Sequence, residues 1–244
     1  MSLLRLHLGL VLLFLYAPLL ALVALSFDPL APFSRYDALW RNPAVQQAAI
    51  HSAIVAVAAT VIATFLGTLI AVGLHNRRRA PILGALSLAP LLLSDVVQGV
   101  ALLSLYAALG FSLGLHSIVL SHVVFTLAFV AAVVRRRLRH FDWRIIEASE
   151  DLGAGGFTTF ARITLPLILP GVLAAALLAL ALSLGDFVLA AITAGEEVQT
   201  LPMLAYAMIK RGTEPEVTAL GTLLLLASFV LVLAAERLSR PRSA

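Results

Sequence analysis

Long apolar runs alternate with short polar segments along this 244-residue chain. The runs are continuous in Leu, Ala and Val and do not alternate apolar with polar, which excludes the strands of a membrane β-barrel. A helix needs about 17–25 apolar residues to cross a bilayer, and lipid requires the backbone to satisfy its own hydrogen bonds. We therefore predict an all-α integral membrane protein with six transmembrane helices. They cover approximately residues 7–27, 48–74, 80–107, 116–134, 164–194 and 217–235.

The composition supports this class and narrows the possible chemistry. The chain is 61% hydrophobic and 12% charged, whereas an ordinary soluble domain is roughly half apolar and a quarter charged. Because there is no cysteine, disulfides, thiolate metal sites and cysteine nucleophiles are excluded. The net charge of +4 does not indicate nucleic acid, since the basic residues gather at the ends of the apolar runs. We expect the lipid bilayer as a partner, and no nucleic acid.

The basic residues also predict the orientation. With the N-terminus in the cytoplasm, 13 of the 17 basic residues fall on the cytoplasmic side, as the positive-inside rule requires, and both termini are cytoplasmic. The first run follows Arg5 and resembles a secretory signal, but a signal has an apolar region of only about 7–15 residues, so we favour a retained helix. Segments 28–47 and 195–216 become outer loops. Trp40 and Trp143 are expected to be membrane anchors near the interfaces.

The cytoplasmic segment between the fourth and fifth runs is polar and broken by glycines. Asp142 is a plausible N-cap for a short helix that begins directly after it, and Gly153 stands where a left-handed C-cap would end that helix. The glycine pair 155–156 allows a reversal, and a second helix leads to Pro166 in the first turn of the next span. Most connections are about 4–6 residues long, so we predict a helix–turn–helix knuckle in preference to a solvated connector.

A spaced motif in this knuckle resembles a known family, the binding-protein-dependent ABC importer permeases with their "EAA" loop. The similarity extends from about residue 40 to residue 237 and is greatest to the second permease subunit of spermidine/putrescine importers. The chain departs from the family pattern at two places. Ser149 stands where the loop motif has its second alanine, and residues 93–95 stand where the family has a Ser-Pro-Asp-like turn. The matching loop residues are Glu147, Ala148, Gly153, Ile163, Leu165 and Pro166.

The resemblance implies the fold and its domains. The fold would be the transmembrane domain of type I importers in a bacterial inner membrane. Its parts would be an N-terminal helix and outer loop (1–46), the transporter domain (47–237) with a cytoplasmic coupling loop (141–166), and a cytoplasmic tail (238–244).

The resemblance also implies a division of labour between subunits. The loop would dock on a cytoplasmic ABC ATPase dimer, with Glu147 meeting a basic residue and Gly153 allowing close backbone approach. A second permease subunit, forming a heterodimer, and an extracytoplasmic substrate-binding protein would complete the importer. This chain would be a non-catalytic subunit without a cofactor, with ATP and Mg²⁺ on the ATPase. A P-loop requires Gly-Lys-Ser/Thr, and the single lysine is Lys210 in an outer loop.

Two acidic residues fall inside apolar runs, Asp95 in the third and Asp186 in the fifth. A carboxylate at the bilayer centre costs about 2.5–3.5 kcal/mol on insertion scales. Counted from the cytoplasmic side at 1.5 Å per residue, they lie roughly 20 Å and roughly 30 Å along their helices, at or beyond the midplane. Both helices are predicted to be interrupted near these acids, because Pro90 and Ser94 precede Asp95 and Gly185 precedes Asp186. Interrupted helices are a common construction of transport sites.

The two carboxylates suit a small cationic solute, and a polyamine is the preferred one. Tyr106, Phe125 and Phe187 are candidates for cation–π contacts with its ammonium groups. The alternative is that each carboxylate pairs with a hydroxyl or cation of a partner subunit in a structural role. His51 and His122 also lie within spans, but neither has a second ligand at metal spacing. We expect packing histidines with hydrogen-bond partners and no metal site.

Other functions stay open. An intramembrane aspartyl protease needs two aspartates in spans, but its Gly-x-Gly-Asp motif is not matched by the Ser-Leu-Gly-Asp of residues 183–186. The serine-hydrolase and zinc-protease motifs are missing from the sequence. An ion-coupled secondary transporter would also place acids in broken helices, yet it would not need the cytoplasmic loop. Sister permeases for phosphonate, iron or thiamine are further alternatives within the importer family.

Overall fold

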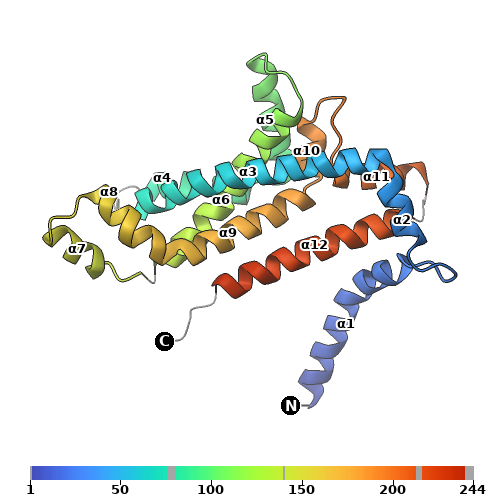
Figure 1. The fold of residues 1–244 in the computed structure, drawn as a ribbon, viewed down its shortest axis with the longest axis horizontal. Helices are drawn as coiled ribbons and strands as arrows, with labels where there is room; N and C mark the ends of the chain where they lie inside the picture. The colour runs from blue at the N-terminus through green and yellow to red at the C-terminus, as the bar shows by residue number, and fades with distance from the viewer. Residues whose placement is uncertain (1, 76–80, 140, 213–215, 240–244) are drawn as a thin grey trace.

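The computed structural model describes residues 2–75, 81–139, 141–212 and 216–239. Every regular element in these residues is helical, which is how a chain in lipid satisfies its backbone. Figure 1 shows several long helices side by side along one axis, with short helices at both ends. The prediction of an all-α membrane protein is confirmed.

Five helices in the described residues are long and apolar enough to cross a membrane. They match the first, second, fourth, fifth and sixth predicted runs. The fifth is one continuous helix, Gly156–Gly185, built from α8, the π-helical turn η2 and α9. The bounds are α1 Ser2–Leu25, α3 Pro43–His75, α6 Leu115–Leu138, α8 Gly156–Thr159, η2 Phe160–Thr164, α9 Leu165–Gly185 and α12 Glu216–Ser239.

The third apolar run is not a single helix, so the prediction of one spanning helix over 80–107 is wrong. The run is divided into a short helix, a 3₁₀ turn and a 14-residue helix. The depth of Asp95 obtained by counting along one helix therefore does not hold. The three elements are α4 Pro81–Leu86, η1 Ala89–Leu92 and α5 Asp95–Ala108.

The position of this break follows from local chemistry, and the predicted interruption is confirmed. Pro90 stands in the first turn of η1, where its missing N–H costs nothing. Ser94 is extended and acts as the N-cap of α5, its hydroxyl accepting the N–H of Val97 at 3.4 Å. Gln98 holds the break closed, because its Nε2 donates to the carbonyls of Pro90 at 2.7 Å and Leu93 at 3.2 Å.

The fifth run is interrupted at its other end, as predicted from Gly185. The helix ends at Gly185, Asp186 is extended, and the chain turns into α10 (Val188–Thr193). The helix begins at Gly156, eight residues before the predicted start at residue 164, and Pro166 lies in the first turn of α9 as expected. The knuckle and the acidic break are therefore the two ends of one helix. At 1.5 Å per residue its 30 residues span about 45 Å.

The core is formed where α3, α6 and α9 pack together. Small residues allow close approach: a Cβ on Gly67 of α3 would lie 2.8 Å from Cγ1 of Val130 on α6. The apolar surface buried in this contact stabilises it by about 25 cal/mol for each Å² removed from water. The central cluster consists of Ala71, Val130, Val134, Leu138, Ile168, Val172, Ala175 and Ala179.

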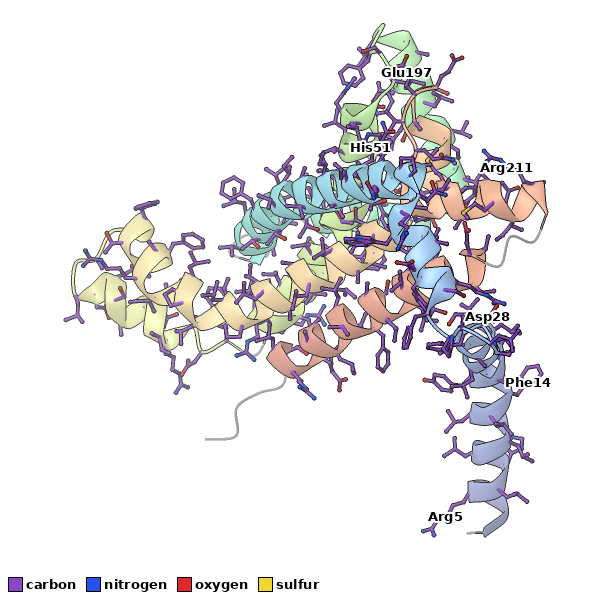
Figure 2. The ribbon with its side chains drawn as sticks, turned by 45° about the vertical axis from the view of Figure 1, so that its right-hand side comes forward. Arg5, Phe14, Asp28, His51, Glu197 and Arg211 are labelled. Atoms are coloured by element: carbon purple, nitrogen blue, oxygen red, sulfur yellow. The ribbon has the colours of Figure 1, made fainter. Side chains whose placement is uncertain are left out.

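The two ends of the bundle carry different short helices. One end holds α7 (Arg144–Asp151) with α8, and the other holds α2 (Ser34–Arg41) and α11 (Leu201–Arg211) (Figure 1). The helix α1 leans away from the rest, with Arg5 at its far end and side chains such as Phe14 projecting freely (Figure 2). Phe14 is 80% exposed, a position that lipid or a partner helix would cover.

Candidate functional site

Asp95 and Asp186, the two acids of the apolar runs, line one cavity of about 370 Å³ near the breaks after η1 and α9. Asp95 enters it from the first turn of α5, and Asp186 from the extended residue between α9 and α10. Phe125 of α6 and Phe187, the N-cap residue of α10, also line it. Four of the five candidate residues are thus brought together, two carboxylates beside two aromatic rings. We call this the acidic cavity.

Asp186 is held by a chain of contacts inside the fold. Its Oδ2 lies 3.0 Å from Nε2 of His122 and accepts the N–H of Ala190 at 3.2 Å. The other ring nitrogen of His122, Nδ1, is 2.7 Å from Oγ of Ser183. The side chains of His122 and Asp186 are only 2% and 7% exposed. The Oδ2 atom of Asp186 is therefore occupied by contacts within this chain.

Asp95 differs from Asp186 in this respect. Its carboxylate forms no hydrogen bond or ion pair with the described residues, and it is half-buried. It is close enough to Asp186 for the two charges to repel each other. A group entering the cavity would therefore meet one carboxylate with a partner and one without.

The pairing of His122 with Asp186 was not visible in the sequence. The expectation that His122 is a packing histidine with a hydrogen-bond partner is confirmed by its bond to Ser183; its Nε2 lies 3.0 Å from Asp186 Oδ2 but forms no hydrogen bond within the described residues. Ser183 lies 61 residues further along the chain than His122, so no local sequence pattern connects the two. The available signal was that Ser183 and Asp186 stand three residues apart in the fifth apolar run, the spacing that places two side chains on one face of a predicted helix. His51 is also paired, with Nδ1 3.1 Å from the carbonyl of Gln199.

The placement of Tyr106 in the substrate path is not supported. Its ring is buried beside Phe111, with centroids 5.4 Å apart, and it does not line the acidic cavity. Its hydroxyl donates to the carbonyl of Ser117 at 3.3 Å and lies 3.0 Å from Oγ of Ser121. These two bonds fix α5 against α6, because a buried Tyr hydroxyl requires a polar partner.

A row of aromatic contacts links the acidic cavity to the outer helix α11. Phe187 packs against Tyr206 with ring centroids 4.7 Å apart. Lys210, one turn further along α11, places its Nζ 5.5 Å from the centre of the Tyr206 ring, within cation–π range. The basic end of α11, where Figure 2 labels Arg211, is thus connected to the wall of the cavity.

The predicted knuckle is present at the opposite end of the bundle. Helix α7 ends at Asp151, and Gly153 caps it as expected, with a φ of +83° in the left-handed conformation that favours glycine. The bond between Oγ of Ser149 and Oγ1 of Thr159, 3.0 Å long, ties α7 to α8. The N-cap assignment needs correction: Trp143 precedes the helix, while Asp142 accepts the N–H of Arg144 at 3.1 Å.

The residues of the spaced motif occupy distinct positions on this knuckle. Glu147 and Ala148 are exposed on α7, and Glu147 lines a cavity of about 340 Å³ together with Glu150. Ile163 lies in the π turn, and Leu165 and Pro166 open α9. The second helix of the knuckle is therefore continuous with the span that follows it.

The tip of the knuckle is apolar and uncovered. Leu152 and Phe157 flank Gly153 and are 89% and 83% exposed. Large apolar side chains at this exposure mark a surface for a partner. Trp143 packs against the central cluster and against Phe141, with rings 5.0 Å apart, and its role as a membrane anchor stays a prediction. Trp40, at the other end, is exposed as an interfacial residue would be.

No group of three or more His, Cys, Asp or Glu within the described ranges is arranged to hold a metal ion. The two sites that remain are the acidic cavity and the knuckle. The carboxylates and rings of the acidic cavity have the chemistry that attracts a cation, and the exposed apolar tip of the knuckle has the chemistry of a protein-contact surface.

The chain matches a family model, "Binding-protein-dependent transport system inner membrane component", over residues 2–244. It is 36% identical over 244 residues to the spermidine/putrescine transport system permease protein PotC of Escherichia coli K12, covering 94% of this chain and 91% of that protein. It is 38% identical over 229 residues to the putrescine transport system permease protein PotI of the same organism, covering 87% and 82%.

Solved structures of ABC transporters share the fold. A bacterial alginate ABC transporter, in complex with an alginate-bound periplasmic protein, superposes with a TM-score of 0.76 at 17% identity, covering 98% of this chain and 93% of that one. The MetNI methionine ABC transporter in an inward-facing conformation gives 0.64 at 19%, covering 82% and 100%.

Proposed function

Because this chain belongs to the family of binding-protein-dependent transport system inner membrane components, we propose that it forms half of the translocation path of an ATP-driven polyamine importer. It is a multi-pass protein of the inner membrane. The proposal includes the transported solute, the partner subunits and the residues that contact each of them. The acidic cavity, with two carboxylates and two aromatic rings, is the observation that carries it.

The proposed topology has six crossings with both termini in the cytoplasm. The broken segment α4–η1–α5 makes the third crossing, beside the five long helices. The excess of arginine at the knuckle end supports this orientation. Residues 1–46, 47–237 and 238–244 then form the N-terminal arm, the transporter domain and the tail, of which residues 240–244 lie outside the described structure.

The proposed partners follow from the two ends of the bundle. A cytoplasmic ABC ATPase dimer docks on the knuckle, where Leu152 and Phe157 offer apolar surface and Glu147 offers charge. An extracytoplasmic binding protein delivers the solute to the opposite end. A second permease subunit covers the remaining face and supplies the other half of the path. This chain is then a non-catalytic subunit, with ATP and Mg²⁺ on the ATPase.

A polyamine fits the acidic cavity for a chemical reason. Its ammonium groups are strongly hydrated cations that need negative charge and aromatic faces to replace water. Asp95 provides a carboxylate without an internal partner, and Phe125 and Phe187 provide the rings. We propose that Asp95 makes the direct contact, while Asp186 contributes charge from its position beside His122.

Uptake measurements test this proposal. In proteoliposomes that contain the assembled importer, ATP-dependent uptake of labelled spermidine should fall at least about tenfold in Asp95→Asn, the loss of one charged contact. Glu197→Gln, a charge removed from an exposed position outside the cavity, is the control. Equal uptake by Asp95→Asn and the parent would refute the role of Asp95.

The same preparation separates the remaining alternatives. Preference for thiamine, phosphonate or iron over spermidine would refute the polyamine assignment while leaving the importer intact. Uptake without ATP or without the ATPase subunit would instead indicate an ion-coupled transporter.

A further inference from the structure

A second cavity, of about 430 Å³, opens between α6, α9 and α12 at the end of the bundle that carries the arginines. We propose that it binds the phosphate headgroup and upper acyl chain of an anionic phospholipid. The proposal depends only on membrane insertion, so it stands or falls independently of the transported solute. The cavity is lined by Val133, Arg136, Arg137, Gly171, Ala174, Leu178, Val232, Ala235, Glu236 and Ser239.

Two guanidinium groups supply the charge for a phosphate. Arg136 and Arg137 stand in the last turn of α6, and neither forms a hydrogen bond or ion pair with any residue of the described ranges. Arginine binds phosphate oxygens through parallel N–H donors. Glu236 also lines the cavity, but it already takes part in another interaction. Two cations against one anion leave the cavity net positive.

The stem of Arg137 packs against α9, which places its charge at the cavity. The Cγ of Arg137 lies against Gly171 of α9, where an added Cβ would be 2.9 Å from it. A neighbouring arginine shows the contrast: Arg135 donates to the carbonyl of Gly84 at 3.3 Å and is engaged within the fold. Holding the side chain in place reduces the rotamer entropy lost on binding.

The rest of the wall distinguishes a lipid from free phosphate. Val133, Ala174, Leu178 and Val232 make the cavity largely apolar, which a hydrated phosphate ion would avoid but an acyl chain would fill. Basic pockets between transmembrane helices near the cytoplasmic face are a known setting for anionic headgroups. The arginines follow an apolar helix directly, so they lie at headgroup depth.

Binding can be measured by native mass spectrometry of the full-length chain titrated with phosphatidylglycerol or phosphatidylcholine. We expect phosphatidylglycerol to be retained more strongly. The variants Arg136→Gln and Arg137→Met should each weaken its retention about fivefold; the methionine keeps an unbranched stem over Gly171. Arg139→Gln is the matched control, since Arg139 is exposed at the same end but does not line the cavity.

A second variant separates shape from charge. Val232→Trp fills the apolar part at an exposed position and leaves both arginines in place, so it should also lower phosphatidylglycerol retention. Helicity and elution volume, unchanged from the parent, establish that each variant is folded. Equal retention of the two lipids, an equal loss in Arg139→Gln, or full competition by inorganic phosphate would each overturn the proposal.

Discussion

At the scale of single residues, the two intramembrane carboxylates have different surroundings. Asp186 lies against His122, which in turn contacts Ser183, and all three are almost fully buried. Buried polar groups are costly unless each has a partner, and a network is stable only when its members are satisfied. Asp95 has no such network. The two acids are therefore distinguished by their neighbours and not by their type, and this difference is why the substrate contact is proposed for Asp95.

Removing one member of the network should destabilise the fold. In Ser183→Ala, the Nδ1 of His122 loses its partner at a site that water does not reach, at a cost of about 1–3 kcal/mol. Thermal unfolding in detergent measures the change. Ser104→Ala is the control, because the exposed Ser104 bonds only to the Val100 carbonyl of its own helix. Equal midpoints for both variants would contradict the structural role of the network.

At the scale of elements, backbone geometry decides how segments meet. Gly153 ends α7 in the left-handed conformation, whereas Gly155, two residues later, has an ordinary φ of −68°. An added Cβ would meet nothing within 4 Å at either position. Any difference between alanine variants at these two sites therefore arises from backbone conformation alone.

We expect Gly153→Ala to disturb the knuckle and Gly155→Ala to leave it intact. The left-handed conformation costs an alanine about 1–2 kcal/mol, which shifts the exposed Leu152–Phe157 tip. The ratio of solute transported to ATP hydrolysed in proteoliposomes should fall several-fold in Gly153→Ala only. Matching ratios in the two variants would show that the turn geometry is not needed for coupling.

The joint between α1 and α2 is set by a titratable group. Asp28 Oδ1 accepts the N–H groups of Leu30 at 2.9 Å and Ala31 at 3.3 Å, and Arg35 lies 3.8 Å from Oδ2. The Leu30 bond and then the Ala31 bond lower the pKa of Asp28 below its ordinary value of 3.8. Burial opposes these bonds with a smaller effect, and the charge of Arg35 adds the smallest contribution to the lowering. Each contact favours the ionised carboxylate.

This gives the joint a defined pH dependence. Because the folded pKa is lowered, the stabilisation is complete above the ordinary value and is lost as pH falls through the lower, folded value. Hydrogen exchange of the 28–31 segment, corrected for intrinsic rates, should therefore accelerate below about pH 4. Asp28→Asn should exchange faster at neutral pH, whereas Asp37→Asn, which loses only the Arg41 pair, should not. Unchanged exchange in Asp28→Asn would refute this assignment.

At the scale of the whole molecule, one continuous helix joins the two candidate sites. Gly156–Gly185 begins at the knuckle and ends at the acidic cavity. Because the two sites stand on one helix, a tilt imposed at one end would displace the other. The π turn at Phe160–Thr164 lies where the helix leaves the knuckle, a feature frequent at functional sites. The arrangement provides a direct path for the proposed coupling.

The packing of α3 against α6 provides a test of the bundle itself. Alanine in place of a helix glycine gains about 1 kcal/mol of helix propensity, so Gly73→Ala, which meets nothing within 4 Å, should raise the unfolding temperature. Gly67→Ala would place its Cβ 2.8 Å from Val130, and overpacking of about 1–3 kcal/mol should reverse the sign. A rise in both variants would show that the two helices are not in close contact.

The sequence alone determined the features that depend on neighbours in the chain. Apolar length predicts the helices, Pro90 and Gly185 predict the breaks, and Gly153 predicts the turn, because each acts through its own backbone. Tertiary structure decided which side chains meet. It paired Asp186 with His122, removed Tyr106 from the acidic cavity, and placed Arg137 in a second one. A helix that is apolar on all sides carries no periodic signal for its inward face, so only packing settles these contacts.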